Sequence, residues 1–192
     1  MYKLCKTEQS AARQRELELA LSEMMNLKRY EDITVSEFCS HVGIPRKAFY
    51  RYFSSKDGAL YALLDHTMLE YEQYRSPHSS LDEKSLLTEM ELFYRFWMRQ
   101  KPILDALEFS GLSGVLLERA ISGIDSGAIL KQLSDRSSEF EQRQIARFAV
   151  SGLMIMMVNW HHDGYRESPR DMAELTVRMF TRPLFPYITE LI

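Results

Sequence analysis

Gly43 and Pro45 stand between two apolar helical patterns, and this break constrains the fold of the chain more than any other feature. Glycine readily adopts the left-handed conformation that ends a helix, and proline fits the first turn of the next helix, where its missing N–H is not needed. Ile44 can fill the corner between the two helices. The sequence therefore predicts a helix-turn-helix.

The first helix of this pair is predicted to begin after Thr34. The threonine hydroxyl can accept a hydrogen bond from the first turn, and Glu37 completes a Thr-x-x-Glu capping box. Apolar or small side chains then follow at Val35, Phe38, Cys39 and Val42. This spacing predicts a helix with one buried face.

The second helix has an apolar side and a basic side. Phe49 and Phe53 lie four residues apart and can anchor it to the first helix. The other face consists of Arg46, Lys47, Ala48, Tyr50 and Arg51. Arginine and lysine can pair with guanine edges, an alanine methyl can contact a thymine methyl, and tyrosine can reach bases or phosphates. This face therefore suits insertion into the major groove of DNA.

The charge of the chain is unevenly distributed. Its formal net charge is −3, which by itself argues against binding to a polyanion. Residues 1–56, however, carry ten Lys or Arg and seven Asp or Glu, a net charge of +3, so the remaining residues carry −6. We therefore expect nucleic acid to bind at the N-terminal end, through few phosphate contacts.

The composition is that of an ordinary globular protein, with 45% hydrophobic and 27% charged residues. Only 8 glycines and 6 prolines occur among 192 residues, which favours helix. The first residues contain no apolar run of the signal-peptide kind, so we expect a cytoplasmic protein. Cys5 and Cys39 lack the spacing of a metal site, and Cys39 is expected to be a small buried residue. No cofactor or metal is expected.

Helical periodicity continues through the rest of the chain, and the sequence predicts an all-α fold of about nine helices. The segment 75–81, Arg-Ser-Pro-His-Ser-Ser-Leu, is the clearest predicted linker. Outside the helix-turn-helix, one helix is predicted to begin at Thr7 or Ser10 and another at Ser55. Further helical segments are predicted over 81–100, 103–109, 115–124, 129–133, 139–162 and 168–187.

Residues 148–158 are apolar on every side except at Ser151 and Gly152. A helix without a polar face must be covered on all sides, and this run is too short to span a membrane. The core of the chain can cover one side. A second copy of the chain is the natural cover for the other side.

The stretch 33–60 resembles the DNA-binding region of the TetR family of bacterial transcriptional regulators. The residues that carry the resemblance are Thr34, Cys39, Gly43, Phe49-Tyr50-Arg51-Tyr52-Phe53 and Ser55-Lys56-Asp57. It implies that Arg46 and Lys47 read bases, that Tyr50 and Tyr52 contact DNA, and that Thr34, Tyr52 and Lys56 contact the phosphate backbone. The chain departs from the family at Ala48, where a DNA-contacting threonine is common, and at Gly58, where a better helix former is usual.

The resemblance also implies an N-terminal three-helix DNA-binding domain, residues 1–55, and a helical ligand-binding and dimerisation domain, residues 56–192. The expected protein is a homodimeric repressor that binds a near-palindromic double-stranded DNA operator, responds to an unknown small-molecule effector and does not associate with membranes. The expected ligand pocket contains Phe93, Tyr94, Trp97, Met98, Phe109 and Met154. The expected dimer interface contains Phe148, Gly152, Ile155, Met156, Met172, Leu175 and Met179.

Two other classes of function stay open from the residues alone. One is a helical enzyme acting on acyl or nucleotide groups, and the other is a helical adaptor that binds a protein through the basic helix. His161 and His162 could suggest a metal site, but adjacent histidines diverge on a helix and no third ligand follows at i+4. Since no nucleotide-binding or nucleophile motif occurs either, we expect no enzyme activity.

Overall fold

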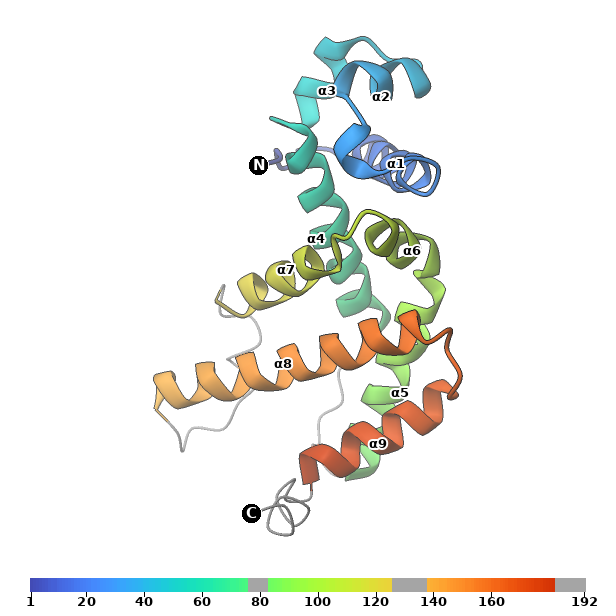
Figure 1. The fold of residues 1–192 in the computed structure, drawn as a ribbon. Helices are drawn as coiled ribbons and strands as arrows, with labels where there is room; N and C mark the ends of the chain where they lie inside the picture. The colour runs from blue at the N-terminus through green and yellow to red at the C-terminus, as the bar shows by residue number, and fades with distance from the viewer. Residues whose placement is uncertain (76–82, 126–137, 182–192) are drawn as a thin grey trace.

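The computed structural model describes residues 1–75, 83–125 and 138–181, which form the predicted all-α protein (Figure 1). The predicted segment 129–133, most of the linker 75–81 and the predicted helix beyond residue 181 lie outside the described residues. The helices are α1 (Glu8–Met25), a 3-10 turn η1 (Tyr30–Asp32), α2 (Val35–His41), α3 (Arg46–Tyr52), α4 (Lys56–Tyr74), α5 (Glu83–Arg99), α6 (Lys101–Phe109), α7 (Ser113–Asp125), α8 (Glu139–His162) and α9 (Pro169–Thr181).

The helices divide into two groups that α4 connects. Figure 1 shows α1, α2 and α3 gathered at one end of the molecule, with α4 running from them towards the remaining helices. In the body, α5 packs along α9 and α7 packs along α8. Among the described residues no helix is long and apolar enough to cross a membrane.

Hydroxyl side chains cap the helices of the N-terminal end, largely as predicted. Thr7, Thr34 and Ser55 each accept a hydrogen bond from a backbone N–H of the first turn of α1, α2 and α4. In the predicted Thr34–Glu37 capping box the Glu37 amide donates to the Thr34 hydroxyl at 3.1 Å, and the Glu37 carboxylate also binds Lys28 Nζ at 2.9 and 3.0 Å. A charge-assisted bond to an ammonium is stronger than one to a neutral N–H. Lys28 thereby also lowers the pKa of Glu37.

The breaks between helices follow the glycine and the prolines. Gly43 has φ +67°, the left-handed conformation that ends α2, and Pro45 directly precedes the first residue of α3. Pro102 lies in the first turn of α6, so it separates α6 from α5. The predicted helix 139–162 coincides with α8.

Arg15 of α1 ties this helix to α4. Its guanidinium donates to Glu70 at 2.8 and 2.9 Å, to the Thr67 hydroxyl at 2.9 Å and to the Leu63 carbonyl at 3.2 Å. It also donates to the fully buried Glu18, at 3.3 Å. All five N–H donors of the arginine are therefore used, and α1 and α4 are held together by polar as well as apolar contacts.

Candidate nucleic-acid interface

Aromatic packing holds α3 against α2, as the sequence predicted. Phe49 is 2% exposed and Phe53 is fully buried. The Phe49 ring meets Phe38 of α2 edge-on at 5.8 Å and lies 5.1 Å from Phe53. A helix of seven residues is marginal in isolation. Its orientation is therefore set by these buried rings.

The face of α3 opposite the two phenylalanines points to solvent. Arg46, Lys47, Tyr50 and Arg51 are exposed, and Ala48 is half-buried. The Arg46 guanidinium lies 6.0 Å from the centre of the Tyr50 ring. The result is an exposed surface of three cations and one tyrosine at the tip of the molecule, which we call the basic face.

Tyr52 does not share this exposure. Its side chain is 5% exposed, and its hydroxyl accepts a hydrogen bond from Arg51 Nη2 at 3.0 Å. The Arg51 guanidinium also covers the Tyr52 ring at 4.9 Å. Tyr52, which was assigned to phosphate contact, is thus a buried residue whose hydroxyl binds the exposed Arg51.

Lys56, the other assigned backbone contact on α4, is largely occupied within the protein. Its ammonium donates to the carbonyls of Tyr30 and Ile33 at 2.6 and 2.7 Å. It also lies 4.2 Å from the centre of the Tyr30 ring, and burial lowers its pKa. Lys56 therefore fastens the turn before α2 onto the start of α4, close to the exposed N-cap Thr34.

Four of the six residues assigned to a ligand pocket lie together in the core of the body. Phe93, Tyr94, Trp97 and Met154 are at most 5% exposed. The Tyr94 hydroxyl bonds Thr176 of α9 at 2.8 Å. The structure does not bring the other two to this cluster: Met98 is 38% exposed and Phe109 is 53% exposed. Both lie on the outer sides of their helices, which periodicity alone did not distinguish.

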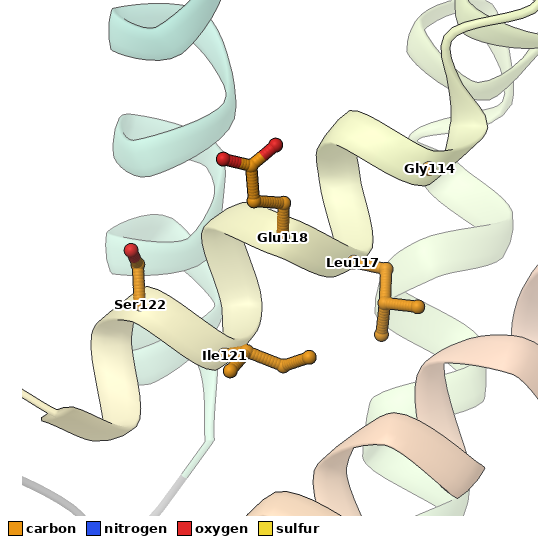
Figure 2. A pocket seen from close by; sticks show the side chains of 5 residues that line it. All are labelled: Gly114, Leu117, Glu118, Ile121 and Ser122. Carbon is orange, nitrogen blue, oxygen red and sulfur yellow. The ribbon is translucent and has the colours of Figure 1, made fainter.

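The body also carries shallow hollows, each lined by a single helix. One is lined by Gly114, Leu117, Glu118, Ile121 and Ser122, all of α7. Figure 2 shows Leu117 and Ile121 on the side of α7 towards α8, and Glu118 and Ser122 on the opposite side. Because one helix supplies every lining residue, this hollow is a surface feature. It is unlike a ligand pocket, which encloses its ligand among several elements.

Five of the seven assigned dimer residues are exposed on α8 and α9. Phe148 is 70% exposed, Ile155 46%, Leu175 39% and Met179 36%. Gly152 is exposed beside them, and Met156 is half-buried. Figure 1 shows the first turns of α8 projecting beyond α5 and α9.

The buried residue of this set is Met172, which is 7% exposed. It lies on the buried side of α9 with Ala173, Thr176 and Val177, the side that packs on α5. The assignment of Met172 to an exposed interface was therefore wrong. The heptad-like spacing of the apolar residues of α9 does not show which of its two apolar sides is covered.

The two histidines at the end of α8 pair with carboxylates of α6. His161 is buried, with Nε2 at 3.1 Å from Glu108 and 3.4 Å from Asp105, and Nδ1 at 2.9 Å from the Tyr165 hydroxyl. His162 is exposed and also bonds Glu108. Burial lowers the pKa of His161, whereas Glu108 raises the pKa of His162. Among the described residues no three such side chains are placed to hold a metal ion. These contacts join α6 to α8.

A family model for the C-terminal region of TetR-type transcriptional regulators matches residues 117–182. This match and the resemblance of residues 33–60 both support the TetR family of transcriptional regulators. Members of this family are DNA-binding regulators and not enzymes, so the match argues against the enzyme alternative. No curated protein sequence matches the chain.

Solved structures share the fold of this chain at low sequence identity. A fatty acid degradation regulator, FadR from Bacillus halodurans, superposes with a TM-score of 0.61 at 13% identity over 94% of this chain and 98% of its own. A TetR-family regulator from Streptomyces coelicolor gives 0.56 at 19% identity over 88% and 79%. The dihydroxyacetone kinase operon activator DhaS gives 0.55 at 18% identity over 86% and 92%.

One contact at the N-terminal end of the molecule was not predicted from the sequence. Residues Met1–Lys3 pair with the end of α3, and Lys3 Nζ donates to the Tyr50 carbonyl at 3.2 Å. Periodicity gives no signal for such a contact, because the partners are about fifty residues apart. The unusual glycine at position 58 was a hint of this contact in the sequence, because Gly58 lies against Met1 in the structure.

Proposed function

We propose that this chain is a cytoplasmic, homodimeric repressor that binds a near-palindromic operator through α3 and releases it when a small molecule binds the body. Residues 1–55 then form the DNA-binding domain, and residues 56–192 the effector-binding and dimerisation domain. The observation that carries the proposal is the basic face, an exposed cationic and aromatic surface on a helix fixed by buried phenylalanines.

The proposed contacts divide into base readers and backbone contacts. Arg46 and Lys47 lie at the start of α3, where a recognition helix meets base edges. Tyr50 and Ala48 lie beside them. Thr34, Arg51 and the Tyr52 hydroxyl beneath Arg51 are suited to phosphates, as charged and hydroxyl groups are in other complexes.

Lys56 can serve DNA in two ways. An ammonium has three donors. Two of them hold the carbonyls of Tyr30 and Ile33, and the remaining bond, to the Glu31 carbonyl, is long at 3.4 Å. That donor can turn to a phosphate while the other two keep the turn before α2 in place.

Dimerisation is supported by the exposed apolar face of α8 and α9. Large contiguous apolar surfaces are rare on monomers and mark protein interfaces. A hollow over this face is lined by Gln144, Arg147, Phe148, Ser151, Gly152 and Ile155 of α8. It can receive side chains from the second copy. Two α3 helices presented by a symmetric dimer would occupy successive major grooves about 34–36 Å apart.

The effector site is proposed at the buried aromatic cluster of Phe93, Tyr94, Trp97 and Met154. Trp97 is 1% exposed, and its indole N–H has no hydrogen-bond partner among the described residues. A buried donor without a partner costs about 1–3 kcal/mol. An apolar effector with a hydrogen-bond acceptor would satisfy Trp97, and it can favour one dimer geometry only through its different affinities for the two.

The test is selection of duplexes from a random DNA library by the purified protein, followed by gel-shift assays at low salt. We expect a near-palindromic site bound by two copies of the chain. Absence of any DNA shift at low salt, with a protein partner that still binds an Arg46→Ala/Lys47→Ala variant, would favour the adaptor function instead. A reporter gene behind the selected site distinguishes repression from activation.

A further inference from the structure

The residues before α1 act as a short strand against the end of α3. Lys3 N donates to the Tyr52 carbonyl at 2.9 Å, and Ser54 N donates to the Met1 carbonyl at 3.1 Å. Tyr2 and Phe53 form an isolated antiparallel bridge between these bonds. The last carbonyls of a helix have no partner within the helix. Residues Met1–Lys3 supply partners for two of them, since Lys3 Nζ also bonds the Tyr50 carbonyl at 3.2 Å.

Gly58, in the first turn of α4, provides the space for this strand. A Cβ built on Gly58 would lie 2.3 Å from the Met1 carbonyl oxygen and 3.1 Å from the Met1 nitrogen. These are backbone atoms, which cannot turn aside as the end of a side chain can. A side chain at this position would therefore displace residues Met1–Lys3, which accounts for a glycine where a helix former is otherwise favoured.

Tyr2 joins the same strand to the body. Its hydroxyl donates to Asp65 Oδ2 of α4 at 2.9 Å, and its ring meets His66 edge-on at 5.3 Å. Burial and Asp65 raise the pKa of Tyr2 to about 12, so the hydroxyl stays protonated and remains a donor at neutral pH.

Arg119 of α7 binds Asp65 from the other side. Its Nε and Nη2 donate to the two Asp65 carboxylate oxygens at 2.8 and 2.6 Å. Such two-pronged ion pairs are strong and fix the relative orientation of the two groups. The side chains of Asp65 and Arg119 are only 18% and 26% exposed. Asp65 therefore touches both the strand at the DNA-binding end and a helix of the body.

We propose that Met1–Lys3 is a clasp that positions the recognition helix α3, and that Asp65 couples this clasp to α7 through Tyr2 and Arg119. The coupling to regulation rests on the proposed function, DNA binding by α3. A shift of α7 that pulls Arg119 from Asp65 changes the acceptor of the Tyr2 hydroxyl. It thereby loosens the strand that holds the end of α3, so α7 controls DNA affinity without touching DNA.

Gly58→Ala tests the clasp itself. We expect faster hydrogen exchange at the Lys3 and Ser54 amides, about tenfold or more, with helix content unchanged, because the opening is local. DNA affinity should fall with it. The matched control is Gly114→Ala, since nothing lies within 4 Å of a Cβ at Gly114. Unchanged exchange at both amides of Gly58→Ala would overturn the clasp. Because this readout needs no DNA, it decides the clasp even if the protein binds no operator.

A double-mutant cycle of Tyr2→Phe and Arg119→Gln tests the coupling. Tyr2→Phe keeps the ring on His66 and removes only the bond to Asp65. If both residues act through Asp65, the losses of operator affinity should be non-additive, and the double variant should lose about as much as the worse single variant. Arg95→Gln, which removes an exposed arginine paired with Glu91 on α5, is the control. Additive losses would show that Tyr2 and Arg119 act independently, and the coupling would be wrong.

Discussion

The two ends of this molecule place aromatic residues in opposite ways. At α3 the phenylalanines are buried and cations face solvent, whereas on α8 Phe148 is 70% exposed and Trp160 in the next turns is buried. A charged outer face over an aromatic core suits a hydrated polyanion. An aromatic outer face suits the dry core of a protein interface. By reversing which side of a helix is apolar, one chain can present one surface suited to nucleic acid and another suited to a protein.

The largest expected effect is a loss of stability, and it should differ between the buried and the exposed aromatic residues. Phe49→Ala should lower the free energy of unfolding by about 3–5 kcal/mol, because it leaves a cavity in the core of the DNA-binding end. Phe148→Ala should change the stability of a dilute, monomeric chain little. Denaturant unfolding at low protein concentration compares them, and equal losses would show that Phe148 is a core residue.

The next effect concerns the dimer. Ile155→Glu places a charge in the exposed apolar face and should weaken dimerisation by about 2 kcal/mol or more, the loss typical of an interface hot spot. Met156→Glu, at a half-buried position, should disturb both the dimer and the adjoining core. Sedimentation measures the association, and Leu69→Glu, at a leucine of α4 that is 56% exposed, is the control. A dimer that survives both α8 variants would place the interface elsewhere.

Arg46→Ala should weaken recognition of the operator sequence. We expect a loss of about 1–3 kcal/mol in operator affinity and relaxed specificity at one base position. Titration against single-base variants of the selected operator measures both. A uniform loss on every sequence would make Arg46 a backbone contact.

Lys56→Ala should weaken binding to all DNA sequences alike and flatten the dependence of affinity on salt by about one unit. It should also destabilise the turn before α2, because the carbonyls of Tyr30 and Ile33 lose their donor. Salt titrations measure the first effect and thermal unfolding the second. An unchanged salt slope with lower stability would restrict Lys56 to a structural role.

The smallest effect is the pH dependence of the histidine pair. The pKa of His162 is raised in the folded state, so its contribution to stability is complete below the ordinary value of about 6.5 and is lost as pH rises through the raised pKa. The pKa of His161 is lowered, so its contribution is present above the ordinary value and is lost as pH falls towards the lowered one. Thermal unfolding of His161→Gln and His162→Gln against pH should show slopes altered in opposite directions.

Local features of the fold could be predicted from the sequence, because the residues that decide them are neighbours in the chain. The helix 139–162, the turn at Gly43 and the caps Thr34 and Ser55 are of this kind. Features set by distant residues could not be predicted. Lys28 binds the carboxylate of Glu37 from nine residues away, and Met1 requires the glycine at position 58.

The candidate site shows the same limit. The basic face follows from helical periodicity, since Arg46, Lys47, Tyr50 and Arg51 are exposed once Phe49 and Phe53 are buried. Helical periodicity shows which residues share a side of a helix, but not whether other helices bury that side. The family resemblance placed Tyr52 among the DNA contacts and Met172 in the dimer interface, but their side chains are only 5% and 7% exposed.

The five bonds of Arg15 have a mechanical consequence. Because they fasten α1 to α4, the two helices form one stiff unit between the body and α3. With 19 residues, α4 is about 28 Å long. A tilt of about 4° at its far end would move its near end by about 2 Å over that length. Helices packed on the lower part of α4 thus have leverage: a displacement too small to disrupt their own packing is enlarged at the end that α3 occupies.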